Sequence, residues 1–198
     1  VISPHAPMDA HSFAINESPT LTGELSRFGS SETLSFSNDL SLSLGIANAA
    51  SDEQIPVSTH KSSLDHGTIV PLYFLAYNSD VNIVHLSFSL LDADTHFSYG
   101  KIIGDICRAS DKRVAIVASG DLSHKLLQGA PAGFSPYGAQ FDDSLVEYLK
   151  KGSVKDILSF DKSVVEGAGE CGLRSIVMLL GALDNMSMHC HVMNYEGP

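Results

Sequence analysis

Two kinds of hydrophobic pattern alternate along the chain. Unbroken apolar runs such as residues 114–117 are typical of a strand that is buried on both faces. Other stretches repeat apolar residues at i, i+3, i+4 and i+7, most clearly at Leu173, Ile176, Val177 and Leu180, which indicates a helix. Strands that alternate with helices predict an α/β fold with a mostly parallel or mixed sheet.

The same pattern places the individual elements. It predicts strands over residues 1–3, 12–16, 55–57, 81–88, 113–119 and 188–195. It predicts helices over 69–76, 139–151, 154–160 and 163–166, one from Asn38 or Asp39 to about Ala50, and one from Asp92 or Asp94 to about Ser110. Pro71 fits near the first turn of the helix over 69–76. The polar stretch 18–31 is rich in Ser, Thr, Gly and Pro and predicts an extended loop or hairpin.

Length and composition indicate one globular unit. A chain of 198 residues with 43% hydrophobic and 18% charged residues is expected to form a single catalytic-type domain over residues 1–198. The chain starts at Val1 inside a predicted strand and stops directly after another. We therefore expect a domain cut from a longer one at both ends, and truncated sheet edges would favour a homo-oligomer.

Charge and cysteine content exclude several partners. The formal net charge of −11 repels phosphate backbones and anionic lipid surfaces, so we expect neither nucleic acid nor membrane as a partner. No apolar run approaches the roughly 20 residues that a membrane span requires, and no signal peptide is recognisable. Three cysteines without a CxxC motif predict a reducing, cytoplasmic location and no disulfide framework.

Four segments combine an apolar run, a turn and a side chain capable of chemistry. They contain His5 in SPHAP, His66 in LDHG, Asp121 and His124 in SGDLSH, and Glu170 with Cys171 in GECG. Each lies at an element boundary, and ligands of open α/β sheets bind beyond the carboxyl ends of the strands. Two imidazoles and a carboxylate are the ligand set of non-haem Fe(II), whereas a thiolate shifts the preference toward Zn or Cu.

Each segment also has a structural interpretation. Asp121 could cap a short helix that starts at Leu122, and Asp65 could be a turn residue. Glu170 could favour the positive end of the helix that follows it. A lone histidine beside a strand is more often a hydrogen-bonded structural residue, and we interpret His11, His60, His85 and His96 in this way.

The ordered motifs carry a family resemblance. VISPHAP, SSLDHGTIVPLYFL, VASGDLSHKL, FSPYGAQFD and EGAGECGLRSIVMLLGAL resemble the class III extradiol ring-cleavage dioxygenase family, of the protocatechuate 4,5-dioxygenase β-subunit type. The nearest branch resembles the MEMO-like proteins, also called AmmeMemoRadiSam system protein B. The resemblance implies a three-layer αβα sandwich around the central sheet.

The resemblance also implies roles for the candidate residues. His5 would be a metal ligand, as would Glu170 or, in MEMO-like members, Cys171; a further metal histidine would come from an upstream motif like PHPP. His124 would be the catalytic base, which Asp121 could orient. His66 would donate a hydrogen bond to negative charge that develops on oxygen.

The implied activity is the opening of a catechol ring next to its diol with O2 and Fe(II), with Zn or Cu as alternative metals. Arg174 could bind an acidic group of this small aromatic substrate, or it could serve a surface or Asp-paired role. The competing hypothesis is a non-catalytic metal- or partner-binding protein on the same scaffold. Cys171 favours it, because an exposed thiolate is a poor companion for Fe(II) and O2.

Overall fold

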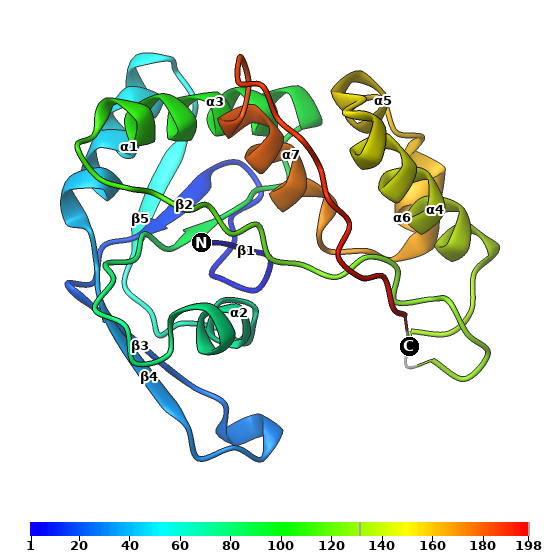
Figure 1. The fold of residues 1–198 in the computed structure, drawn as a ribbon, viewed down its shortest axis with the longest axis horizontal. Helices are drawn as coiled ribbons and strands as arrows, with labels where there is room; N and C mark the ends of the chain where they lie inside the picture. The colour runs from blue at the N-terminus through cyan, green and yellow to red at the C-terminus, as the bar shows by residue number, and fades with distance from the viewer. Residues whose placement is uncertain (131, 198) are drawn as a thin grey trace.

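The computed structural model describes residues 1–130 and 132–197 (Figure 1). Its strands are Ile2–Ser3 (β1), Phe13–Asn16 (β2), Thr20–Glu24 (β3), Thr33–Ser37 (β4), Val57–His60 (β5) and Leu86–Ser87 (β6). Its α-helices are Leu40–Asp52 (α1), His66–Ala76 (α2), Ala93–Ala109 (α3), Pro136–Lys151 (α4), Val154–Leu158 (α5), Lys162–Ala168 (α6) and Leu173–Ala182 (α7). A short 3-10 helix, Ser26–Phe28, lies between β3 and β4.

The central sheet is mixed, and helices cover both of its faces. Its strand order is β1-β6-β2-β5; β1 runs parallel to β6 and β2 parallel to β5, whereas β2 and β6 are antiparallel. Helices α1, α3 and α7 lie over one face and α2 lies below the other (Figure 1). The predicted α/β class and αβα layering are therefore confirmed.

The main core lies between the sheet and the helices above it. Its fully buried members come from β1, β2, α1, β6, α3 and α7 and include Ile2, Phe13, Ile15, Ile46, Tyr99 and Met178. The backbones of helices α3 and α7 are in direct contact at Gly100, where an added Cβ would lie only 2.2 Å from the Met178 carbonyl oxygen. This close packing fixes α7, and with it the turn at residues 170–172 that precedes the helix.

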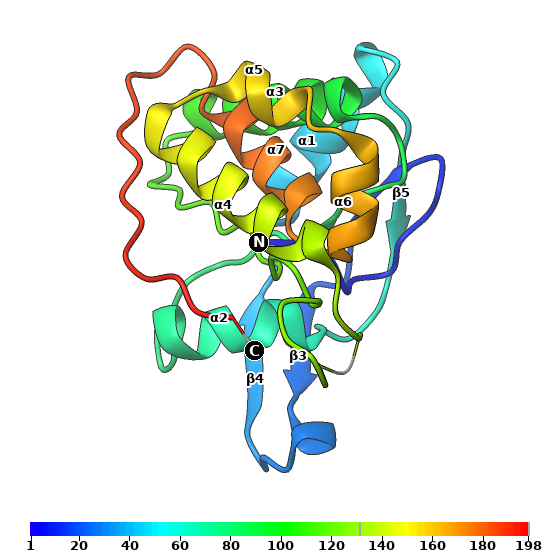
Figure 2. The same ribbon diagram turned by 90° about the vertical axis from the view of Figure 1, so that its right-hand side faces the viewer.

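Two smaller cores flank the main one. The β3–β4 hairpin, which extends away from the sheet in Figure 2, packs Leu21, Leu34 and Phe36 against Ile69 and Leu72 of α2. Helices α4, α5 and α6 form a second group around Phe141 and Leu145 and pack on α7. Among the described residues, no helix combines the length and the apolar character needed to cross a bilayer.

The prediction of a buried strand over 113–119 is wrong for most of that segment. Only the end of this segment pairs with β1: Ile2 N donates to Val117 O at 2.8 Å, and Ser119 N donates to Ile2 O at 2.9 Å. Val114 is 42% exposed, and residues 112–117 line a cavity of about 560 Å³ with β1, α1 and α3. An apolar run predicts burial only where a second layer covers it, and no described element covers the start of this segment.

Several boundaries also differ from the predicted ones. Residues 188–195 form no strand, and the strand expected over 81–88 is reduced to β6, preceded by a single bridge at Ile83. The strand expected at 55–57 lies at β5 instead. Helix α2 begins at His66 rather than at residue 69 because the Asp65 side chain caps it, so Pro71 lies inside the helix and not in its first turn.

Candidate active site

Two turns from distant parts of the chain meet through their backbones. Gly120, with a φ of 150°, approaches Gly172 so closely that a Cβ at residue 120 would lie 2.4 Å from the Gly172 Cα. Such a φ favours glycine. The backbone oxygen of Asp121 accepts hydrogen bonds from Cys171 N at 3.1 Å and Gly172 N at 2.9 Å. The SGDLSH loop is therefore fastened to the turn that starts α7.

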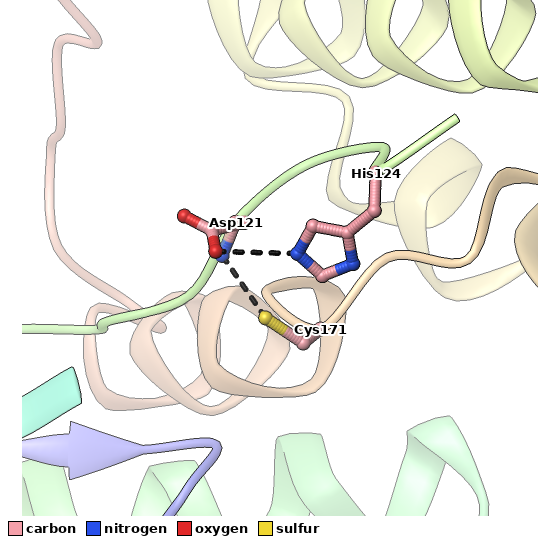
Figure 3. A group of neighbouring side chains, drawn as sticks. All are labelled: Asp121, His124 and Cys171. Carbon is pink, nitrogen blue, oxygen red and sulfur yellow. Dashed lines mark hydrogen bonds and ion pairs between the residues drawn. The ribbon is translucent and has the colours of Figure 1, made fainter. Parts of the chain in front are cut away.

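This contact brings three chemically capable side chains together. Asp121 Oδ2 lies 3.2 Å from His124 Nε2, and the backbone N–H of Asp121 donates to Cys171 Sγ at 3.1 Å (Figure 3). The candidate ligand atoms of Asp121, His124 and Cys171 all lie within 4.8 Å of one another. The His124 side chain is 39% exposed and that of Asp121 is 73% exposed, so a small molecule can reach the group from solvent.

The donor set of this group suits a divalent transition metal. It offers one carboxylate oxygen, one imidazole nitrogen and one sulfur, the mixture that zinc, copper and iron sites use. Burial raises the pKa of the Cys171 thiol, and the hydrogen bond from Asp121 N lowers it in part. The large cavity beside residues 112–117 contains none of these three side chains in its lining, so it is a separate feature.

Glu170 has a different environment from its neighbour Cys171. Its Oε2 accepts a hydrogen bond from Leu173 N at 2.6 Å, at the positive end of α7. Burial raises the pKa of the Glu170 carboxyl, a rise that the Leu173 bond and the charge of Arg174 oppose. The structure thus places Cys171, and not Glu170, in the group with Asp121 and His124. The contact of Glu170 is the one that the helix-end interpretation predicts.

The two remaining histidines of the candidate set lie against each other. The His5 and His66 rings stack with centroids 4.2 Å apart and an interplanar angle of 25°. The pKa of His5 is lowered, first by burial and then by the charge of His66. Asp121 and His124 also act on the pKa of His5, the first raising it and the second lowering it. The charges of Asp65, Asp121 and His124 therefore all act on His5.

Comparison with known proteins then decides the family. The family model described as the catalytic LigB subunit of aromatic ring-opening dioxygenase matches residues 1–198. This chain belongs to that family. The resemblance predicted from the ordered motifs is therefore confirmed.

Similar proteins carry more than one name. The chain is 38% identical over 135 residues to a protein of Clostridium acetobutylicum, covering 68% of this chain and 29% of the relative. It is 31% identical over 104 residues to the 4,5-DOPA dioxygenase extradiol of Beta vulgaris (51% and 38% covered). It is 25% identical over 146 residues to a MEMO1 family protein of Methanosarcina acetivorans (73% and 50% covered). The chain thus spans half or less of the length of each of these relatives.

A solved structure supports the fold. The crystal structure of an uncharacterised Escherichia coli K12 protein superposes with a TM-score of 0.66 at 20% sequence identity. The match covers 93% of this chain and 75% of that one. At this identity the likeness shows the αβα fold.

Arg174 lies beside the site without entering the three-residue group. Its guanidinium carbon lies 5.6 Å from the centroid of the Phe88 ring, a cation–π distance. Its charge acts to lower the pKa of both Glu170 and His96, after the larger effect of burial on each. These contacts fit a half-buried structural cation, and the substrate-binding role of Arg174 stays a prediction.

The sequence did not predict the polar contacts that Asp65 and His85 make next to the segments that carry His5 and His66. The sequence indicates for Asp65 at most a turn residue, and for His85 only a generic structural histidine. In the structure His85 Nε2 lies 3.1 Å from Asp65 Oδ2; the His85 side chain is fully buried and that of Asp65 is 11% exposed. Although burial alone would raise the pKa of Asp65, hydrogen bonds from His85, Ser3 and Thr68 lower it to about 2. A capping aspartate before a helix is visible in LDHGT, but its buried partners are not.

Proposed function

We propose that this chain carries the active site of a metal-dependent dioxygenase that opens the ring of a catechol beside its two hydroxyls. The observation that carries the proposal is the solvent-accessible group of Asp121, His124 and Cys171, assembled from turns 50 residues apart. Membership of the aromatic ring-opening dioxygenase family supports it. The named substrate of the Beta vulgaris relative, DOPA, is a catechol and suggests the substrate class.

His124 is the residue proposed to move the proton. When its Nε2–H donates to Asp121 Oδ2, 3.2 Å away, its Nδ1 keeps a free lone pair that can accept a proton from a catechol hydroxyl. Asp121 then orients the ring and stabilises the imidazolium that forms, as carboxylates do for catalytic histidines. His66 is proposed to donate a hydrogen bond to negative charge that develops on a substrate oxygen.

The proposed metal ligands are His5 and Cys171, with Glu170 as the alternative to Cys171. The Cys171 sulfur lies within 4.8 Å of the His124 and Asp121 ligand atoms, and a sulfur together with the imidazole nitrogen of His5 is a donor set that fits a transition metal. Fe(II) bound there would provide the place where catechol and O2 meet, and Zn or Cu are the alternatives that the thiol favours.

The test uses the protein loaded anaerobically with Fe(II), then exposed to O2 with L-DOPA as probe. Ring opening gives a coloured product whose formation is followed by absorbance. We expect His124→Ala to lose turnover and to keep its metal. We expect the metal affinity of Cys171→Ser to fall at least tenfold. His11→Ala and Cys190→Ser, both at exposed sites, are the matched controls. Turnover of the His124 variant at the wild-type rate would remove that residue from the mechanism.

A non-catalytic metal-binding protein is the second candidate. The observation that favours it is that His124 itself lies within the three-residue donor group, where it could ligate the metal instead of moving a proton. Similarity to a MEMO1 family protein supports this alternative. Under it, His124→Ala loses metal as strongly as Cys171→Ser does, and no catechol is opened by the wild-type protein.

A further inference from the structure

The carboxylate of Asp65 accepts hydrogen bonds from three separate parts of the chain. Its Oδ1 accepts from Ser3 Oγ at 2.5 Å and from Thr68 N at 3.1 Å. Its Oδ2 accepts from Thr68 Oγ1 at 3.1 Å and pairs with His85 Nε2 at 3.1 Å. The side chain is only 11% exposed. Four donors around a buried carboxylate fix its position more tightly than a helix cap alone would.

The neighbouring residues determine the tautomer of His85. Asn16 Oδ1 accepts from the backbone N–H of Ser18 at 3.0 Å, which identifies the amide oxygen. The amide nitrogen of Asn16 is then the atom that faces His85 Nδ1 at 3.3 Å. Because that nitrogen has no lone pair to offer, His85 Nδ1 must accept. The proton of neutral His85 therefore sits on Nε2 and is donated to Asp65.

Asp65 in turn connects the two segments that carry the stacked histidines. Ser3 Oγ, having donated its proton to Asp65, accepts from the backbone N–H of His5 at 3.2 Å. Asp65 is also the N-cap of α2, whose first residue is His66. At Gly67 the packing is so close that a Cβ would lie 2.7 Å from Ser3 Oγ and 3.2 Å from the His5 ring.

We propose that Asp65 is a positioning residue that holds His5 and His66 together, and that His85, fixed as the Nε2–H tautomer by Asn16, holds Asp65 in place. This inference deepens the proposed function and rests on it, because it assigns how two residues of that site are oriented. Neither Asp65 nor His85 belongs to the three-residue group of Asp121, His124 and Cys171. Their effect on chemistry would pass through the histidine pair.

The first test is NMR of the histidine side chains in the metal-free protein, which needs no substrate. Wild-type His85 is expected to show a slowly exchanging Nε2–H and an unprotonated Nδ1. The stacked His5 and His66 rings shift each other's ring-proton signals. His85→Leu should move both sets of signals toward their unstacked positions. His85→Gln keeps an N–H donor near the Nε2 position and should largely restore them.

Two results would overturn the inference: a proton on His85 Nδ1, or unchanged His5 and His66 signals in folded His85→Leu. If that variant does not fold, Ser3→Ala serves instead. It removes only the link between Asp65 and the His5 backbone, so the His5 signals should shift more than those of His66. Equal shifts, or none, would contradict the proposal.

The second test separates this inference from the proposed function. With L-DOPA and Fe(II), His85→Leu should lower kcat by about 10- to 100-fold with a smaller change in KM, and His85→Gln should recover most of kcat. A wild-type protein without turnover would refute the proposed function, while the NMR result would still decide the positioning role. Turnover in His85→Leu equal to wild type would refute the positioning role alone.

Discussion

The two halves of the candidate site are held in place by different means. The His5–His66 half rests on side-chain hydrogen bonds to the buried carboxylate of Asp65. The half that contains Asp121, His124 and Cys171 rests on backbone contacts between two glycine turns, and its side chains reach solvent. One half therefore depends on the charge and hydrogen bonds of buried groups. The other depends on a close approach of two backbone turns, which is possible because glycine has no Cβ.

This difference predicts which substitutions each half tolerates. The His5–His66 half, here called the side-chain-held half, should respond to isosteric changes that alter hydrogen bonding, and to pH. The half that contains Asp121, His124 and Cys171, here called the backbone-held half, should tolerate conservative changes of its exposed side chains but not added volume at Gly120 or Gly172. A substitution in either half is therefore best compared with a matched position elsewhere in the chain.

The largest effect is expected from Gly120→Ala. The new Cβ would lie 2.4 Å from the Gly172 Cα, a backbone atom that cannot move aside unless the two turns separate. The φ of 150° adds strain for any residue other than glycine. Together these should lower the free energy of unfolding by about 3 kcal/mol, measured by urea denaturation.

Gly129→Ala is the matched control for that substitution. Gly129 also has a positive φ, of 94°, but nothing lies within 4 Å of the Cβ that alanine would add. It should cost only the backbone strain, about 1 kcal/mol. Equal losses at the two glycines would show that the close approach of the turns is unimportant for stability.

The next effect is expected from Asp65→Asn in the side-chain-held half. The pKa of Asp65 falls from its ordinary 3.8 to about 2 in the folded protein, and each unit is worth about 1.4 kcal/mol. The ionised carboxylate therefore stabilises the fold by about 2 kcal/mol above pH 4, and this contribution disappears as the pH falls from 4 toward 2. Urea unfolding at pH 7 should show the full loss in the variant.

Repeating that measurement at low pH isolates the contribution of the charge. The difference between wild type and Asp65→Asn should shrink steadily from pH 4 to pH 2.5, because the carboxyl of the unfolded wild-type chain, with its ordinary pKa of 3.8, takes up a proton before the folded one does and so favours unfolding. Asp111→Asn, at an exposed position, should change stability little at any pH. A difference for Asp65→Asn that does not depend on pH would contradict the charged network.

Sequence patterns predicted the helices of this fold better than its strands. Helix α7 and the starts of α1 and α3 followed from local spacing and caps, which depend on neighbours three or four residues away. Of the two cap candidates at each start, the structure selects Asp39 and Asp92. The strand over 113–119 failed because an apolar run says nothing about whether another segment covers it. Burial of a strand is decided by partners that are distant in the sequence.

The candidate site divides in the same way. The turns at 119–124 and 170–172 were located from the sequence because glycine and polar residues interrupt apolar runs there. The sequence could not predict that Cys171, and not Glu170, would join Asp121 and His124. The two residues are adjacent, and the backbone of the turn decides in which direction each side chain points. The buried contacts of His85 were equally invisible, because they join residues 20 to 69 positions apart.

The smallest effect is expected from Tyr195→Phe, which tests whether a third segment supports the backbone-held half. Tyr195 Oη donates to Asp142 Oδ2 at 2.6 Å, and Asp142 Oδ1 accepts from Ser123 N at 2.8 Å, one residue before His124. Losing this hydroxyl should cost about 1 kcal/mol. Burial, and then Asp142, raises the pKa of Tyr195 from 10 to about 12. The stabilising contribution of the hydroxyl is therefore present below pH 10 and is lost as the pH rises toward 12.

Tyr77→Phe is the matched control. The Tyr77 hydroxyl contacts Glu32 at the surface at 3.4 Å, so its loss should cost less stability at neutral pH. Equal losses for the two tyrosines would remove Tyr195 and Asp142 from the support of the loop and leave the contact between Gly120 and Gly172 as its main anchor.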